Sequence, residues 1–260
     1  MSTTARQSFI GATSSEENAR ILADPGASYR LLYWDVASVG ATSRDILTYG
    51  KARWSNRLPA DDEWQAGKLP TPFGVMPVLT VTGLGGKEVV MSESIVIDHY
   101  LAKKFGLLGN NEWEEITIKA FYSNIHYLRE RSFMCVTWTY ADKRKVALET
   151  FMTKTLPTFI ADHEFHLKAN GSNGHYVGDK LSLADIHLAN VMDHFSHLPS
   201  GEAITAEFKK CTELWKVKET VEQNPEIAAW RATDECKALV KGSIYCYSHT
   251  APSDGADQEE

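Results

Sequence analysis

The sequence lacks the features of a membrane-spanning or secreted protein. No stretch approaches the roughly 18 consecutive apolar residues that a helix needs to cross a bilayer. The first 28 residues contain no apolar core of the kind found in signal peptides. We therefore expect a cytoplasmic protein with no membrane as a partner.

An excess of positive charge is also missing. The 260 residues include 27 Lys and Arg against 34 Asp and Glu, which gives a net charge of -7. A protein that binds nucleic acid usually carries a basic patch or a basic balance. We expect no nucleic acid as a partner.

Cysteine is scarce, and neither cysteine nor histidine forms a metal-binding pattern. The four cysteines are Cys135, Cys211, Cys236 and Cys246. They have no paired-ligand spacing, so we interpret them as buried or incidental thiols in a reducing compartment. The pairs His163/His166 and His194/His197 lack the His-Glu-x-x-His spacing and a completing ligand. No metal site is expected.

The chain is long enough for two domains, and its patterning changes once. We expect residues 1–27, rich in Ser, Thr, Ala and Glu, to be a flexible extension, and the acidic residues 251–260 to be a disordered tail. Between them, strands and helices alternate at first. The expected elements are a buried strand at 29–34, a helix at 41–51, a short strand at 53–56, a loop at 58–74, a hairpin of strands at 76–81 and 87–91, and a helix at 94–105.

The second half has helical patterning and no convincing strand. The expected helices cover residues 112–140, 143–168 (bent by Pro157), 181–197 and 225–239. The sequence therefore predicts an α/β domain over residues 28–107, followed by an all-helical domain over residues 112–250.

Two sites in the first half could bind a ligand, and each has a simpler interpretation. Pro77 enters a strand although it cannot donate to the ladder; a cis Met76-Pro77 bond would leave the Met76 backbone facing outward, whereas an edge strand or a trans turn is the simpler alternative. Ser94 opens a helix, whose free N–H groups suit a carboxylate, whereas plain capping is the alternative. In the second half, Ser182 and Asp185 form a capping-box pattern that we interpret as structural.

Taken in order, these segments resemble the cytosolic glutathione transferases, and most closely their tyrosine-type, sigma-like branch. The resemblance covers about residues 29 to 245. The matching segments are Leu31-Leu-Tyr33-Trp34, Trp64, Lys68, Pro72-Phe-Gly-Val-Met-Pro77, Ser92-Glu-Ser94 and Gly178 to Asp185. The resemblance implies a thioredoxin-like glutathione-binding domain followed by an all-helical domain.

The resemblance also implies a catalytic hydroxyl. Tyr33 takes the position of the tyrosine that donates to the glutathione sulfur, where a hydrogen bond favours the nucleophilic thiolate over the thiol. The run ending in Ser38 is also similar to the serine-type transferases, and we favour Tyr33 over Ser38. The arginine that the family often has near the thiolate is replaced by Val39.

The other parts of glutathione map onto the remaining matched positions. By the resemblance, the Met76 backbone beside Pro77 pairs with the cysteinyl unit. Glu93 faces the γ-glutamyl ammonium and Ser94 its carboxylate, and Trp64 and Lys68 contact the glycine end. The electrophile candidates, which have the same helical spacing as a core stripe, are Tyr122, His126, Arg129 and Phe133.

The function implied is conjugation of glutathione, as co-substrate, to a small hydrophobic electrophile. A glutathione-dependent isomerase would use the same first site, and a non-catalytic binding or regulatory module could share the fold. By analogy with the family, a homodimer is expected.

Overall fold

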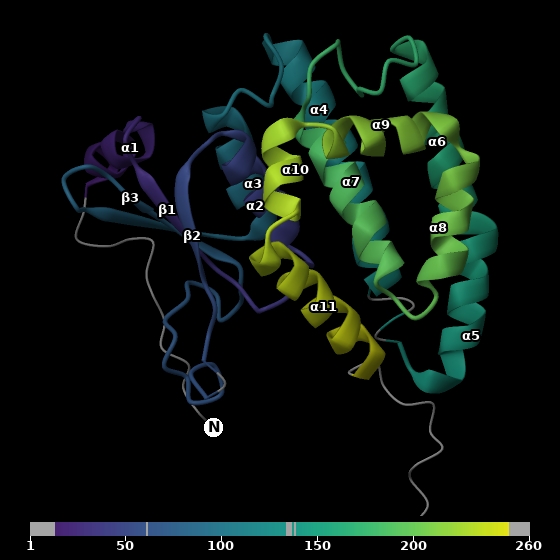
Figure 1. Cartoon of the computed structure of the whole chain (residues 1–260), viewed down its shortest axis with the longest axis horizontal. Helices are drawn as coiled ribbons and strands as arrows, with labels where there is room; N and C mark the ends of the chain where they lie inside the picture. The colour runs from purple at the N-terminus through teal and green to yellow at the C-terminus, as the bar shows by residue number, and fades with distance from the viewer. Residues whose placement is uncertain (1–13, 61, 134–136, 138, 250–260) are drawn as a thin grey trace, which may run out of the picture. The chain divides into compact units, whose positions relative to one another are not determined.

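The computed structural model describes residues 14–60, 62–133, 137 and 139–249. The chain divides into two compact units, residues 1–105 and 106–260 (Figure 1). The first is a small mixed sheet with helices and the second is helical, which confirms the predicted fold class. No described helix is long and apolar enough to cross a membrane.

The first unit contains a four-stranded sheet of order β2-β1-β3-β4. The strands are β1 (Ser28–Leu32), β2 (Arg53–Arg57), β3 (Val78–Thr82) and β4 (Glu88–Ser92). Strand β1 runs parallel to β2 and antiparallel to β3, which is antiparallel to β4. Strand β3 lies inside the sheet, between β1 and β4. Pro77 stands one residue before the first paired residue of β3, Val78, so the N–H that proline lacks is not needed for the ladder. The simpler interpretation of an edge strand is therefore wrong.

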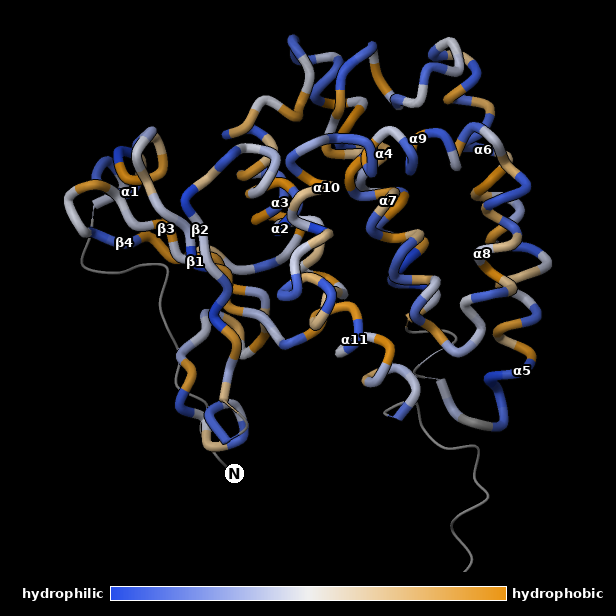
Figure 2. The backbone as a smooth tube through the Cα atoms, in the orientation of Figure 1, coloured by the Kyte–Doolittle hydropathy of each residue, from blue (hydrophilic) through white to orange (hydrophobic). Residues whose placement is uncertain are grey.

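One face of this sheet forms the core of the first unit. Successive side chains of a strand point to opposite faces, and Leu31, Leu79 and Val81 are completely buried on the same face. Helix α3 (Ser94–Lys104) packs against β3 and β4, and helix α2 (Gly40–Tyr49) packs against α3. Hydrophobic residues accordingly colour much of the central strands in Figure 2.

A helix that the sequence did not predict precedes the sheet. Helix α1 (Ser15–Ala23) begins where the Ser14 hydroxyl accepts from the Glu17 N–H at 3.2 Å. Its end is held by Tyr100 and Lys104, which donate to the Leu22 carbonyl at 3.1 and 2.9 Å. The expectation of a flexible extension over residues 1–27 is thus wrong for α1. Residues 1–13 and the tail expected at 251–260 lie outside the described residues.

The second unit is built around one buried helix. Its elements are α4 (Glu112–Ser132), α5 (Ala141–Thr150), the π-helical η2 (Phe151–Thr155), α6 (Leu156–Ala169), α7 (Leu183–Ser196), α8 (Gly201–Lys210), α9 (Thr212–Glu222), α10 (Pro225–Arg231) and α11 (Asp234–His249). Nearly every residue of α7 is buried, because α4, α8 and α9 pack around it.

Three expected helices differ from the structure. Helix α4 ends at Ser132 rather than at 140, and the described residues Phe133 and Thr137 beyond it have π-helical geometry. The helix expected at 143–168 is divided by η2, because Pro157 lacks an N–H and the turn before it widens so that the Leu156 N–H bonds to the Phe151 carbonyl. The helix expected at 225–239 is two helices, α10 and α11, since the Thr233 hydroxyl accepts from the Cys236 N–H at 3.2 Å. Helices α8 and α9 were not predicted.

The predicted capping box is confirmed, and it extends into a buried polar network. The Asp185 carboxylate accepts from the Ser182 N–H and from the Tyr176 N–H, each at 2.8 Å. The Tyr176 hydroxyl lies 2.6 Å from Nδ1 of His163, whose Nε2 lies 3.0 Å from Oδ1 of Asn124. Since that Asn124 atom is an acceptor, Nε2 carries the proton and Nδ1 accepts from Tyr176. Burial lowers the pKa of His163 to about 3.

This histidine should make the helical unit sensitive to acid. The pKa of His163 is about 6.5 in the unfolded chain and about 3 in the fold, so the unfolded state binds more protons between these values. The contribution to stability is complete above about pH 6.5 and is lost as the pH falls toward 3. We expect His163→Gln to cost about 1–3 kcal/mol at pH 7.5, because it disturbs a buried hydrogen-bond pair, and to flatten the loss of stability in acid. Urea unfolding at pH 7.5 and 5.0 measures both effects.

The matched control is His249→Gln, which changes an exposed histidine of the same unit that does not contribute to the pKa of His163. This substitution should leave the difference in the free energy of unfolding between pH 7.5 and pH 5.0 the same as in the wild type. If both substitutions reduced the loss of stability in acid equally, this loss could not be assigned to His163.

Candidate functional site

The strand register collects the predicted site residues at one end of the sheet. Leu32 lies opposite Val78, which lies opposite Ser92 in the next ladder. The next residue along β1 is Tyr33, the one before β3 is Pro77, and the one after β4 is Glu93. These three residues therefore stand side by side, although 60 positions separate the first from the last.

Tyr33 follows β1 directly and is held by its backbone. Its N–H donates to the Arg57 carbonyl at 3.2 Å, and the residue is 5% exposed. The Tyr33 hydroxyl makes no hydrogen bond to any other described residue. Its oxygen is also not one of the unpartnered side-chain atoms that are completely buried, so solvent can reach it. The hydroxyl is thus available to donate to an atom of a ligand.

Ser38 lies further along, in the turn that leads into α2. Its backbone has a left-handed φ of 37°, its carbonyl accepts from the Ala41 N–H at 3.2 Å, and the residue is half-buried. The Ser38 hydroxyl, the alternative to Tyr33, therefore lies at the start of α2. Tyr33, five residues earlier, directly follows β1.

The Met76-Pro77 peptide bond is cis, as proposed from the sequence. Pro77 is buried and Met76 is half-buried immediately before it. The backbone of Met76 lies outside the ladder of β3, which begins at Val78.

The start of α3 is open to a ligand. Glu93 is its N-cap residue, with φ 72° and ψ 115°, and no side chain caps the helix. Plain capping by Ser94 is therefore not what the structure contains. Glu93 is exposed and makes no ion pair among the described residues, and the first N–H groups of α3 stand beside the Ser94 hydroxyl.

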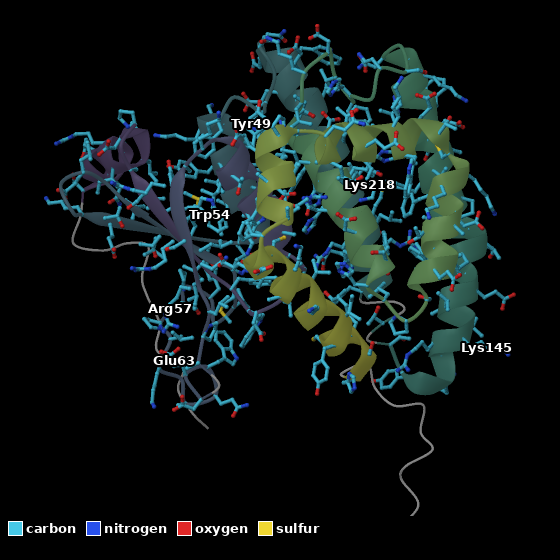
Figure 3. The ribbon with its side chains drawn as sticks, viewed as in Figure 1. Tyr49, Trp54, Arg57, Glu63, Lys145 and Lys218 are labelled. Carbon is cyan, nitrogen blue, oxygen red and sulfur yellow. The ribbon has the colours of Figure 1, made fainter. Side chains whose placement is uncertain are left out.

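The segment that connects β2 to β3 is held over this end of the sheet. The Trp34 and Trp64 rings meet edge to face with centroids 5.3 Å apart. Arg57 donates to Glu63 at 2.6 Å, and this bond lowers the pKa of Glu63; Figure 3 labels both side chains. Lys68 is exposed and paired with Asp62 at 3.1 Å. Trp64 is thus anchored next to the strand end, whereas Lys68 stands in solvent.

Comparison with known proteins identifies the family. The family profile "Glutathione S-transferase, C-terminal domain" matches residues 126–234. The chain is 32% identical to "Probable glutathione S-transferase 7" of Caenorhabditis elegans over 213 residues, which cover 79% of this chain and 96% of that protein. The chain belongs to the glutathione S-transferase family.

Solved structures agree with this membership. The structure of prostaglandin synthase D of Nilaparvata lugens is 26% identical with a TM-score of 0.69, over 80% of this chain and 98% of that one. The monomeric glutathione S-transferase Na-GST-3 of Necator americanus is 27% identical with a TM-score of 0.64, over 80% and 97%. Transferases of this family use glutathione as co-substrate, so the chain is a transferase of this class.

Three of the four electrophile candidates share one side of α4 and the fourth, Phe133, directly follows the helix, but two of the four are buried. Tyr122 is 0% exposed, and its ring centroid lies 5.9 Å from that of His126, on which it stacks, and 4.2 Å from that of the tilted His187 ring. Arg129 is also buried, and its Cζ lies 5.5 Å from the Phe133 ring centroid. Burial lowers the pKa of His126, and Arg129 adds to this shift. Tyr122 and Arg129 therefore belong to the packed interior of the helical unit, behind the half-buried His126 and Phe133.

The histidine pairs singled out in the sequence are occupied by other contacts. His163 bonds to Tyr176 and Asn124, and Nδ1 of His194 lies 3.3 Å from the Tyr247 hydroxyl. Within the part of the chain that the structure describes, no group of three or more His, Cys, Asp or Glu side chains is arranged to hold a metal ion. Cys135 is outside that part.

Sequence reasoning missed Arg44, a completely buried arginine on α2. The signal that could have found it is its spacing from Leu47, a completely buried residue, because residues three apart share one face of a helix. A buried charge of this kind needs partners close by.

The open start of α3 gives a direct test of glutathione binding. Ser94→Ala should weaken glutathione binding about 10-fold or more, because a hydrogen bond to a charged group contributes about 1.5–3 kcal/mol. Ser92→Ala is the matched control, since its hydroxyl is buried without a hydrogen bond among the described residues. Isothermal titration with glutathione measures both dissociation constants. Equal weakening by the two substitutions would contradict a role for Ser94.

Proposed function

We propose that this transferase is a tyrosine-type, sigma-like enzyme that activates glutathione as the thiolate and conjugates it to a small hydrophobic electrophile. One observation carries the proposal. Tyr33 presents a hydroxyl without an internal partner at the same end of the sheet as Met76, Pro77 and Glu93. A ligand that lies along this end can meet all four residues.

Each part of glutathione then has a partner. The Met76 backbone pairs with the cysteinyl unit, and Glu93 binds the γ-glutamyl ammonium. Ser94 and the first N–H groups of α3 bind the γ-glutamyl carboxylate, which the positive end of the helix dipole also favours. Trp64 borders the glycine end, and Lys68 reaches its carboxylate by leaving Asp62, an exchange that costs little for an exposed pair.

The chemistry follows from the hydroxyl. When the thiol loses its proton to solvent, the hydrogen bond donated by Tyr33 stabilises the anionic sulfur. Each unit by which the thiol pKa falls corresponds to about 1.36 kcal/mol in favour of the thiolate. The sulfur lone pair forms a bond to an electrophilic carbon, and the displaced electron pair leaves with the leaving group or takes up a proton. Holding the two reactants together supplies the rest of the acceleration.

For the electrophile we propose the surface formed by His126 of α4 and by Phe133, the residue that follows this helix. Both side chains are half-buried, and Tyr122 and Arg129 support them from within the helical unit. Because burial lowers the pKa of His126, its ring is neutral at pH 7. An aromatic ring and a neutral imidazole suit an apolar electrophile better than a charged one.

A second candidate is an isomerase that uses glutathione through the same first site. The likeness to the prostaglandin synthase of Nilaparvata lugens favours it. A non-catalytic module of the same fold would keep the architecture without turnover. Retention on immobilised glutathione, followed by turnover assays with conjugation and isomerisation substrates, distinguishes the three.

We also propose a homodimer in the cytoplasm. The tendency of oligomers toward two-fold symmetry supports this, although one solved relative is described as monomeric. Sedimentation at several protein concentrations measures the oligomeric state.

The role of Tyr33 is tested by removing its hydroxyl alone. Tyr33→Phe should lower kcat about 10- to 150-fold and change glutathione affinity less than 3-fold, because the lost hydrogen bond acts on the thiolate. Ultraviolet absorbance of the thiolate against pH should give a higher thiol pKa for bound glutathione. Ser38→Ala serves as the comparison and should retain most activity. The reverse ranking of the two variants would assign the thiolate to Ser38 instead.

A further inference from the structure

Arg44 is a charged side chain in the interior of the first unit, and its partners are unusual. The residue is 1% exposed. Its Nη1 donates to the carbonyls of Val36 and Ala37 at 2.8 and 3.2 Å, and Nη2 donates to the Trp34 carbonyl at 3.4 Å. A single guanidinium therefore binds three carbonyls of the short loop that follows Tyr33.

The same group also reaches the neighbouring strand. Nε of Arg44 donates to Oδ1 of Asn56 at 2.9 Å, and Asn56 pairs with Leu31 in the parallel ladder. Because a guanidinium is planar and its donors have fixed directions, all its acceptors must keep fixed positions relative to one another. Arg44 thus joins the end of β1, the loop after it and β2 into one rigid piece.

The ring of Tyr33 lies against this piece. Cζ of Arg44 is 5.7 Å from the Tyr33 ring centroid. Gly40 makes the close approach possible, since a Cβ at this position would lie 2.8 Å from Cδ1 of Tyr33 and 3.1 Å from Nη1 of Arg44. The lack of a side chain at Gly40 is required by space, because one added carbon would displace the ring, the guanidinium or both.

We propose that Arg44 is a positioning residue for the Tyr33 hydroxyl, and that Gly40 provides the space for it. The inference rests on the proposed role of Tyr33 in stabilising the thiolate. Arg44 holds the strand end and the loop, so the direction of the Tyr33 ring is set by packing rather than by a bond to its own hydroxyl. A catalytic hydrogen bond depends steeply on distance and angle, so a small shift of the ring weakens it.

The test measures the thiol pKa of bound glutathione, a quantity that a loss of stability alone does not move. Thiolate absorbance is followed against pH at saturating glutathione for the wild type, Arg44→Lys, Arg44→Met and Gly40→Ala. We expect the thiol pKa to rise by about one unit in all three variants, which lowers kcat/KM near neutral pH about 10-fold. Lysine should not restore the wild-type value, since it cannot bind the three carbonyls in a fixed fork.

Two further variants separate the possible failures. Ser43→Ala is the stability control, because the Ser43 hydroxyl lies beside Arg44 on α2 but donates to the buried Asp98 at 2.5 Å. It should lower the free energy of unfolding and leave the thiol pKa unchanged. Tyr33→Phe tests the proposed function itself and should raise the thiol pKa.

The outcomes are distinct. If Tyr33→Phe leaves the thiol pKa unchanged, the proposed role of Tyr33 fails. If Tyr33→Phe raises it but Gly40→Ala and Arg44→Lys do not, only the positioning by Arg44 is refuted. If the Arg44 variants do not fold, Gly40→Ala tests the close packing of the Tyr33 ring against the guanidinium, and an unchanged thiol pKa in this variant refutes the positioning.

Discussion

Strand β3 pairs with β1 on one side and with β4 on the other, and the registers of these two ladders determine how Tyr33, Pro77 and Glu93 of the proposed glutathione site are aligned. A slip of one residue in either ladder would turn the buried face of a strand toward solvent. The complete burial of Leu31, Leu79 and Val81 therefore protects the alignment of Tyr33, Pro77 and Glu93. The backbone hydrogen bonds of the β1/β3 and β3/β4 ladders therefore set both the packing of the core and the alignment of these three residues.

Each unit also uses one buried charged group to tie a loop to regular structure. In the first unit the Arg44 guanidinium binds the loop after β1 through its carbonyls. In the second, the Asp185 carboxylate binds the Tyr176 and Ser182 N–H groups ahead of α7. The cationic guanidinium is bound by carbonyl oxygens, and the anionic carboxylate is bound by N–H groups. In both cases backbone dipoles stabilise a charge that burial would otherwise penalise.

The sequence predicted the elements whose pattern is local and strongly periodic. All four strands, helices α2 and α3, the cis Met76-Pro77 bond and the capping box at Ser182 were anticipated, as was the glutathione transferase family. Helix α1 was missed because it buries a single apolar residue, Ile21, and its attachment depends on Tyr100 and Lys104, about 80 positions away.

The candidate site was predictable to a similar extent. Motif order indicated which residues gather near Pro77, and the strand register brings Tyr33 and Glu93 beside it. Helical spacing could not distinguish a pocket from a core stripe on α4, where Tyr122 and Arg129 are buried. The part played by Arg44 depends on acceptors in a loop and on another strand, which no local pattern encodes.

If Glu93 binds glutathione as proposed, this residue places fold stability and ligand recognition in opposition. Its φ of 72° is easy for glycine and unfavourable for a residue with a Cβ, by about 1–3 kcal/mol. Glycine there would relax the backbone but abolish the only negative charge between β4 and α3. A screen that selects for heat resistance alone would therefore favour loss of this carboxylate, whereas a screen for glutathione capture would retain it despite the strained turn.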